Sequence, residues 1–203
     1  MDQPPQDLFG EVPQPAPRRP AQRRAPAAQP RHTLFFALRP DPSDAAAIDR
    51  FAAGLLASLG VSGKRIAPER LHVTLDLVGH DADQASVDAA RRAAATVRFA
   101  AIDVRFDAVM SFDAPSAPLV LLGAQGLDAV RGLRTTLGGA LADQGFKPPR
   151  TYEPHMTLCY DPRHRIERKP LEPIGFRATG FALVRSHIGL SRHEVLGTWP
   201  LGN

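Results

Sequence analysis

A short motif occurs twice in the chain and brings histidine and threonine to the same spacing each time. His72 and Thr74 lie in the sequence LHVTL, and His155 and Thr157 lie in PHMTL, so His-x-Thr-Leu repeats after 83 residues. Both copies sit in short apolar runs that predict strands. Residues i and i+2 of a strand project from the same face, about 6.5–7 Å apart. Four side chains therefore converge if the two strands meet at a cleft.

That set of side chains suits the cleavage of a phosphodiester. The reaction needs a base to activate the attacking oxygen and an acid to protonate the leaving oxygen. Histidine can do either near neutral pH, because its unperturbed pKa is about 6.5. Threonine hydroxyls can hydrogen-bond the non-bridging phosphate oxygens without adding a charge that repels the anion. The scheme needs no metal ion and no other cofactor.

Two other interpretations of the motifs compete with catalysis. A single histidine on a strand is most often a core residue with one backbone partner, but repetition of the whole motif favours catalysis. A metal site is the other alternative, because Asp76 and Asp161 lie near the motifs in the sequence. The H-x-H and H-E-x-x-H spacings typical of zinc ligands do not occur in the sequence, so we expect no metal site.

The elements around the motifs predict an α+β fold. Strands are expected at 33–38, 71–78, 99–106, 119–122 and 155–160, and around 181–190 and 195–201. Helices with apolar residues at helical spacing are expected from an N-cap at Ser43 or Asp44 to 59, over 83–97, and from 127 to 141, with glycines at 60 and 145 ending two of them. Because strands and helices do not alternate strictly, antiparallel sheets fit better than a doubly wound parallel sheet.

The N-terminal segment 1–31 differs in composition from the rest of the chain. It holds eight prolines and five arginines, and its few large apolar residues cannot bury enough surface to offset the entropy lost on ordering. We predict a disordered tail with polyproline character, followed by a folded domain at 32–203. We interpret the tail as a solvated linker, with loose electrostatic affinity for RNA as the alternative.

The composition excludes several classes of protein. Of the 203 residues, 43% are apolar and 23% are charged, which is an ordinary balance for a globular protein. No run approaches the roughly 20 apolar residues of a membrane helix, and the N-terminus lacks the apolar stretch of a secretory signal. Cys159 is the only cysteine, so no internal disulfide can form. We expect a cytoplasmic protein without membrane association.

The two motifs resemble those of the 2H phosphoesterase superfamily. Within it, the chain is similar to the RNA 2′,3′-cyclic phosphodiesterases, also called the 2′-5′ RNA ligase family. The similarity covers 32–203 and includes LFFALRP at 34–40, LHVTLDLVG at 71–79, PLVLLG at 118–123, YEPHMTL at 152–158 and TWPL at 198–201. The resemblance implies two pseudo-twofold-related lobes whose antiparallel sheets line a central cleft, with the helices outside.

The resemblance also implies an activity. It is the metal-independent hydrolysis of an RNA-terminal 2′,3′-cyclic phosphate to a 2′-phosphomonoester, with a reverse 2′-5′ ligation. We assign His155 as the base that activates water, His72 as the acid that protonates the departing O3′, and Thr74 and Thr157 as phosphate ligands. The expected partners are RNA or oligonucleotide ends, and the expected state is a monomer. The alternatives are a 2H phosphodiesterase acting on 2′-5′ oligoadenylate or a small cyclic nucleotide, and a non-catalytic RNA-binding module.

The chain departs from the family pattern at one position of the second motif. Many members carry an arginine three residues after the second threonine, where this chain has Tyr160. A tyrosine hydroxyl can donate a hydrogen bond but supplies no charge. Arg150, Arg163 or Arg65 could supply the charge instead, since each lies near the end of a predicted motif strand. We take Tyr160 and Arg150 as candidate substrate-binding residues.

The remaining polar and aromatic residues near the motifs carry weaker expectations. Cys159 shares strand parity with His155 and Thr157, so an unbroken strand turns it toward the cleft, although burial as a small thiol is the preferred interpretation. Asp76 holds the matching position in the first motif. Phe112 could stack on a base or belong to the core. The other histidines are expected at the surface or with satisfied partners: positions 32, 80, 164, 187 and 193.

Overall fold

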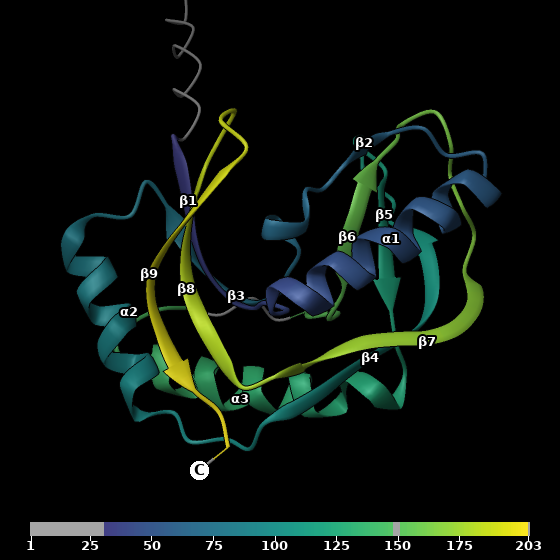
Figure 1. Cartoon of the computed structure of the whole chain (residues 1–203). Coiled ribbons are helices and arrows are strands. Elements are labelled where there is room, and N and C mark those ends of the chain that lie inside the picture. The colour runs from purple at the N-terminus through teal and green to yellow at the C-terminus, as the bar shows by residue number, and fades with distance from the viewer. Residues whose placement is uncertain (1–30, 148–150, 203) are drawn as a thin grey trace, which may run out of the picture.

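The computed structural model describes residues 31–147 and 151–202 (Figure 1). The strands are β1 His32–Leu38, β2 Lys64–Arg65, β3 Val73–His80, β4 Ile102–Ser111, β5 Pro118–Leu122, β6 Met156–Tyr160, β7 Lys169–Ala178, β8 Gly180–His187 and β9 Arg192–Pro200. The helices are α1 Pro42–Ser58, α2 Gln84–Thr96 and α3 Asp128–Asp143, with short 3-10 turns η1 Pro68–Arg70 and η2 Gln125–Leu127. The prediction of a disordered tail concerns residues that, apart from Arg31, lie outside this description, and it stays a prediction.

The described strands form one strongly curled antiparallel sheet in the order β7-β4-β5-β6-β3-β1-β8-β9, with β2 paired to β6. The sheet rises as two walls: β3, β1, β8 and β9 make the first wall, and β6, β5, β4 and β7 make the second (Figure 1). The α+β fold with antiparallel pairing is therefore confirmed. The two walls form a single sheet because one residue pair, Val73 with Met156, joins β3 to β6.

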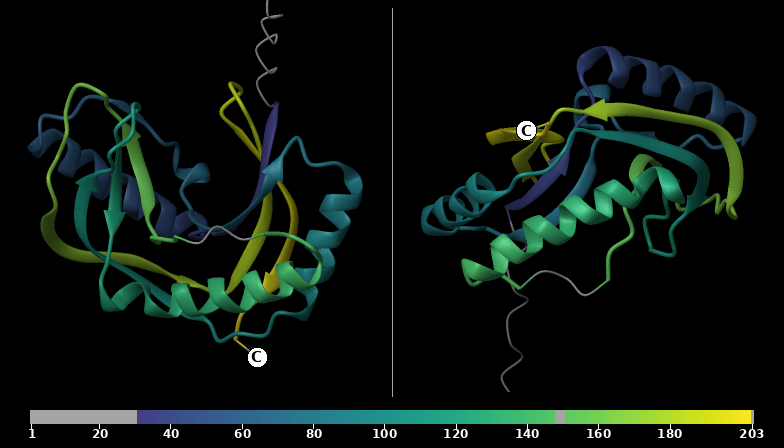
Figure 2. Two further views of the ribbon diagram at one scale, coloured as in Figure 1. Left: turned by 180° about the vertical axis from the view of Figure 1, so that it is seen from behind. Right: turned by 90° about the horizontal axis from the view of Figure 1, so that it is seen from below.

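The helices cover the outside of this curled sheet. Figure 2 shows α3 running beneath both walls, and α3 contacts both β3 and β4. Helix α2 packs on α3 and touches β9, and α1 packs against η1 and β7. No helix of the described residues is long and apolar enough to cross a membrane.

Helix α1 begins earlier than the sequence suggests. Its N-cap is Asp41, whose carboxylate accepts a hydrogen bond from the Asp44 backbone N–H at 2.8 Å. The prediction of Ser43 or Asp44 as the cap is therefore wrong. Pro42 fits the first helical position, because its missing N–H has no partner there in any helix. The glycine ends are confirmed, since Gly60 and Gly145 have φ angles of +67° and +87°.

Strand β7 was not predicted, because Pro170 and Pro173 read as strand breakers. The strand lies at an edge of the sheet, where the missing N–H of a proline can point away from the single neighbouring strand and then costs no hydrogen bond between strands. Strand β2 was also missed, and with two residues it is too short to show a pattern. Strand β3 starts at Val73, two residues later than expected.

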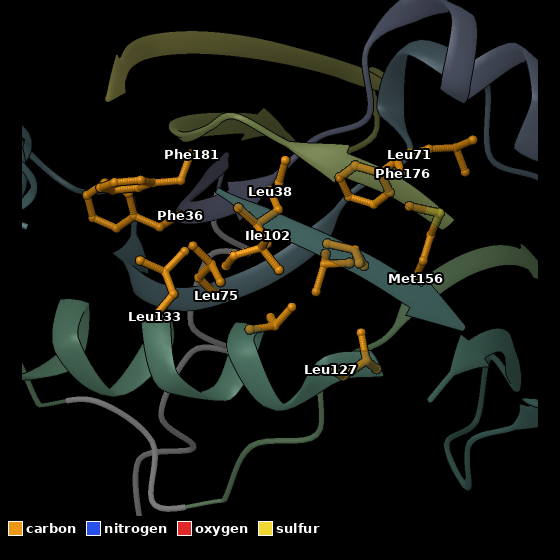
Figure 3. Close-up of a cluster of buried hydrophobic side chains, with 14 of the residues drawn as sticks. Phe36, Leu38, Leu71, Leu75, Ile102, Leu127, Leu133, Met156, Phe176 and Phe181 are labelled. Carbon is orange, nitrogen blue, oxygen red and sulfur yellow. The ribbon is translucent and has the colours of Figure 1, made fainter. Parts of the chain in front are cut away.

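The main hydrophobic core lies between the strands and α3. Figure 3 shows Leu133 of α3 facing Leu75 of β3, with Ile102 of β4 beside them. All three side chains are buried, and so are Val73 and Met156 at the junction of the walls. The burial of Val73 and Met156 decides which face of β3 and β6 points away from the core and can carry functional side chains.

Candidate active site

The pairing of Val73 with Met156 sets the orientation of both motifs. These two side chains are fully buried in the core. Neighbouring residues on a strand project to the opposite face. The two residues that flank Val73 and the two that flank Met156 therefore all project away from the core. The antiparallel register sets the histidine of each motif beside the threonine of the other.

The four motif side chains line one pocket of about 320 Å³. The full lining is Thr33, Phe35, Ile66, Arg70, His72, Thr74, His155, Thr157, Tyr160, Ser186 and His193. The structure thus brings together His72, Thr74, His155 and Thr157, as expected from the repeat. It also adds residues from η1 and from the β8–β9 hairpin that the sequence did not indicate.

The two motif histidines are held by the same backbone contact. His72 Nδ1 lies 2.7 Å from the carbonyl oxygen of Arg70, and His155 Nδ1 lies 2.7 Å from the carbonyl oxygen of Glu153. A carbonyl oxygen can only accept a hydrogen bond, so Nδ1 carries the proton in both rings. Nε2 is then left to accept a proton in the neutral ring or to donate one in the charged ring. Both imidazoles are thereby oriented for acid–base chemistry.

The two histidines differ in their surroundings. The His72 ring packs against Phe35 with centroids 5.1 Å apart and against His193 at 5.3 Å. The His155 ring meets the edge of Phe112 at 4.7 Å. Phe112 is half-buried beside the pocket and packs on β4 and β5 side chains, so it serves the core while touching a motif histidine.

Burial lowers the pKa of His72 to about 4, and the positive charges of His155, Arg70 and Arg39 act in the same direction. The hydrogen bond to the Arg70 carbonyl opposes this shift only in part. His72 is therefore neutral at pH 7 in the free protein, with an unprotonated Nε2. Burial likewise lowers the pKa of His193 to about 4, helped by repulsion from His72.

A β-bulge follows each motif and changes which side chains reach the pocket. Along β6, Thr157 pairs with Val120 and Cys159 pairs with Leu119, so Leu158 is an extra residue in that strand. Cys159 is consequently buried, and burial raises the pKa of its thiol to about 11. The placement of Cys159 toward the cleft by strand parity is thus wrong, and its interpretation as a small buried thiol is confirmed.

The same bulge explains the position of Tyr160. On an unbroken strand Tyr160 points away from the face of Thr157, because the two are three residues apart. The extra residue reverses that parity, and Tyr160 lines the pocket with 41% of its surface exposed. Tyr160, a candidate substrate-binding residue because of the family resemblance, therefore reaches the pocket through a distortion that the sequence did not reveal.

The first motif carries the equivalent bulge at Leu75. Along β3, Thr74 pairs with Ala37 and Asp76 pairs with Phe36. Asp76 is turned into the core, 3.5 Å from Arg134, and burial raises the pKa of its carboxyl. It is a buried carboxyl and does not line the pocket.

The arginine candidates for phosphate charge do not line the pocket. Arg65 forms an ion pair with Asp49, and Arg163 bonds Asp161 and the Ser62 hydroxyl. Arg150 lies outside the described residues. Arg70 was not singled out from the sequence although it stands only two residues before His72, and the structure places it in the pocket wall.

The expectation for His193 is wrong. The sequence shows no partner for this residue, but the β8–β9 hairpin pairs it with Ser186 and carries both into the pocket lining. Its Nδ1 is buried and has no hydrogen-bond partner in the described part of the chain. Only the tertiary pairing of β8 with β1 brings this hairpin to His72, so no local sequence signal could have found it.

The carboxylates of the metal alternative are engaged elsewhere. Asp161 accepts hydrogen bonds from the backbone of Ser62 and Arg163 and contacts His164 at 2.9 Å. These bonds, led by the one with His164, lower the pKa of its carboxyl well below the usual range. Within residues 31–147 and 151–202, no group of three or more His, Cys, Asp or Glu side chains is arranged to hold a metal ion.

A family model described as the 2′-5′ RNA ligase superfamily matches residues 40–189 of the chain. A comparison with curated proteins finds no match.

Solved structures share the fold. LigT of E. coli, crystallised with NADP+, superposes with a TM-score of 0.68 at 22% identity, covering 86% of this chain and 100% of LigT. LigT crystallised with 3′-AMP gives 0.67 at 22% identity, with the same coverage. TT0787 of Thermus thermophilus gives 0.62 at 23% identity, covering 84% of this chain and 98% of that protein.

Proposed function

The chain belongs to the 2′-5′ RNA ligase superfamily of 2H phosphoesterases, and we propose that it hydrolyses an RNA-terminal 2′,3′-cyclic phosphate to a 2′-phosphomonoester. One observation carries the proposal: two histidines, each with Nδ1 on a backbone carbonyl, and two threonines line a single pocket. The crystallisation of the structurally similar LigT with 3′-AMP supports a nucleotide as the ligand.

The surroundings of the histidines favour one order of proton transfer. His72 is neutral at pH 7, so its Nε2 can take a proton from water as the oxygen attacks phosphorus. The bond from phosphorus to O3′ breaks, and O3′ receives the proton of His155 Nε2. This order is the reverse of the assignment made from the sequence. The physical reason is the burial of His72, which disfavours the charged form that an acid needs.

The threonines complete the scheme. The hydroxyls of Thr74 and Thr157 are placed beside the histidines by the β3–β6 register. They can donate hydrogen bonds to the non-bridging oxygens as charge builds on the pentacovalent phosphorus. The reaction uses these four side chains and water, without a metal ion. Run in the same direction with a 5′-hydroxyl in place of water, the same steps open the cyclic phosphate, release O3′ and join two ends through a 2′-5′ linkage.

The test is incubation of an oligoribonucleotide that ends in a 2′,3′-cyclic phosphate with the protein in excess EDTA. The terminal phosphate is then identified against 2′- and 3′-phosphate standards. We expect the 2′-phosphate. A 3′-phosphate product would contradict the assigned cleavage of the bond from phosphorus to O3′. Absence of turnover would favour the alternative function, a non-catalytic RNA-binding module. A parallel panel of 2′-5′ oligoadenylate and small cyclic nucleotides identifies the substrate class, and faster turnover of either would replace RNA ends as the substrate.

A further inference from the structure

The pocket contains one permanent positive charge. Among the described residues that line it, Arg70 is the one arginine or lysine, and none is an aspartate or glutamate. Arg70 is the last residue of η1, and no carboxylate of the described pocket lining neutralises its charge. A cavity with one guanidinium, three imidazoles and no carboxylate is suited to an anion.

The guanidinium of Arg70 has a hydrogen-bond donor that a ligand could use. Its Nε is buried and has no hydrogen-bond partner within the described chain. Among the described residues, Arg39 and Arg185 also have a buried Nε without a partner, but a terminal nitrogen of Arg39 donates to the Glu69 carbonyl and one of Arg185 lies 3.6 Å from Glu194. A buried donor without a partner costs free energy, and an arriving anion removes that cost.

Of the two pseudo-twofold-related motifs, only the first has a cation beside its histidine in the described pocket lining. Arg70 and Glu153 hold equivalent positions, because each lies two residues before a motif histidine and offers its carbonyl to that histidine. Glu153 is paired with Arg131 at 3.0 Å and is not part of the pocket lining. The two halves of the site therefore share their histidines and threonines but differ in charge.

We propose that Arg70 binds the substrate phosphate and, by standing on the His72 side alone, makes the two histidines unequal. The claim that Arg70 binds an anion rests on the residues that line the pocket. Only the identification of that anion as the reacting phosphate rests on the proposed function. Arg70 supplies the charge that Tyr160 lacks. A planar guanidinium can bond two phosphate oxygens at once, whereas the hydroxyls of the pocket bond one each.

The inequality has a direct consequence for the reaction. Burial lowers the pKa of His72 most, and the charge of Arg70 adds to this by opposing protonation of the neighbouring imidazole in the free protein. His72 thus stays available as the base. His155 has no such cation in the pocket lining on its side, which leaves the role of acid to it.

The anion site is tested by titrating inorganic phosphate into the wild type, Arg70→Gln, Arg70→Lys and Arg177→Gln, followed by NMR. Arg177 pairs with Asp103 on the outside of the second wall, so its substitution removes the same charge away from the pocket. We expect Arg70→Gln to weaken phosphate binding at least tenfold, the scale of a lost charge-assisted hydrogen bond, and Arg70→Lys to retain part of it. Arg177→Gln should match the wild type.

Equal phosphate affinity in Arg70→Gln and Arg177→Gln would overturn the proposal, and so would a wild type that binds no phosphate. If the protein hydrolyses a cyclic phosphate but its affinity for inorganic phosphate does not depend on Arg70, the proposed function stands and this inference is wrong. If phosphate affinity depends on Arg70 but no diester is cleaved, the anion site stands and the proposed function is wrong. Should Arg70→Gln not fold, the wild type still answers, because phosphate must shift the Arg70 Nε–H and His72 ring resonances.

A second measurement separates binding from mere packing. The His72 ring is titrated by NMR in the wild type, Arg70→Gln and Arg70→Lys. Removing the charge should raise the pKa of His72 in Arg70→Gln, whereas Arg70→Lys should titrate close to the wild type. A structural role for the arginine would not be restored by lysine in this way, so the same pKa in all three proteins would contradict the inequality of the histidines.

Discussion

Val73 and Met156 pair across the junction of the two walls, and each is the central residue of a His-x-Thr motif. Both side chains are fully buried, so the core fixes the register of β3 against β6. A slip of one residue would turn the motif histidines and threonines into the core. The packing that stabilises the junction is therefore the same feature that assembles the pocket.

The first prediction concerns the two motif histidines. His72→Asn and His155→Asn should each lower kcat by roughly 10²–10⁴-fold, the usual scale for losing a positioned acid or base. Asparagine keeps a side-chain N–H for the carbonyl that now accepts from Nδ1, so the fold should survive. Turnover of an RNA end with a cyclic phosphate is measured beside thermal unfolding.

His187→Asn provides the matched control, because His187 lies in the β8–β9 hairpin, bonds Glu194 and is not part of the pocket lining. It should leave turnover unchanged. Near-full activity in either motif variant would contradict the two-histidine mechanism. A collapse of the melting temperature in His72→Asn would instead show that the ring's packing on Phe35 is its main role.

The sequence predicted the four motif side chains because two simple rules apply to them. Alternation along a strand places His72 with Thr74 and His155 with Thr157, and the repeat indicates that two such pairs belong together. The same alternation failed for Cys159, since the bulge at Leu158 inserts one residue that the apolar pattern cannot show. A bulge depends on how the partner strand pairs, and no local signal in the sequence reports that.

The rest of the pocket could not be predicted for a related reason. His193 reaches His72 only because β8 pairs with β1, which is a contact between segments more than 140 residues apart in the sequence. Arg70 was close enough to His72 to be suspected. Its direction depends on the η1 turn that begins at Pro68, and the strand expected from residue 71 gave no information about that turn.

The second prediction separates Tyr160 from its pseudo-symmetric counterpart. Tyr160→Phe should raise KM by about 2–10-fold with little change in kcat, because a neutral hydrogen bond contributes roughly 0.5–1.5 kcal/mol. Leu77 occupies the equivalent place after the first motif and is 42% exposed, but it does not line the pocket. Leu77→Ala should leave both constants unchanged. A hundredfold loss of kcat in Tyr160→Phe would show a catalytic role for the hydroxyl.

The third prediction is the dependence of the rate on pH. A base works in its neutral form, so kcat/KM should fall on the acid side as the free protein is protonated near the His72 pKa of about 4. It should fall again on the alkaline side, where the acid has lost its proton. The acid limb of kcat should lie at higher pH than that of kcat/KM, because the bound phosphate favours the imidazolium. Both limbs belong to the coupled pair.

The profile is measured from roughly pH 3 to 9, which brackets both limbs, with EDTA in excess. The unperturbed histidine value alone would give a maximum between roughly pH 6 and 8, and burial of His72 extends activity to the acid side. EDTA should not change the profile. A metal-bound hydroxide would give activity that rises to a plateau and is lost with the metal, and restoration by zinc or manganese would reject the two-histidine scheme.

The last prediction concerns stability and follows from two half-buried imidazoles of the pocket. His72 and His193 have pKa values of about 4 in the folded protein, against the ordinary 6.5 in the unfolded chain. Between these values the unfolded chain binds more protons, so the free energy of unfolding falls as the pH is lowered from 6.5 toward 4. Each imidazole can contribute a slope of up to about 1.4 kcal/mol per pH unit.

Two variants resolve this slope by urea unfolding between about pH 4.5 and 7. Carboxyls with lowered pKa, such as Asp41 and Asp83, lose their contribution only below their ordinary value of 3.8, so this window reports the buried groups. His193→Asn should lose less stability than the wild type as the pH falls, because one of the two imidazoles is gone. Asp76→Asn should do the opposite. The raised pKa of Asp76 stabilises the fold as pH falls, and its removal steepens the loss. Constant stability of Asp76→Asn across this window would show that the pocket does not hold its histidines neutral.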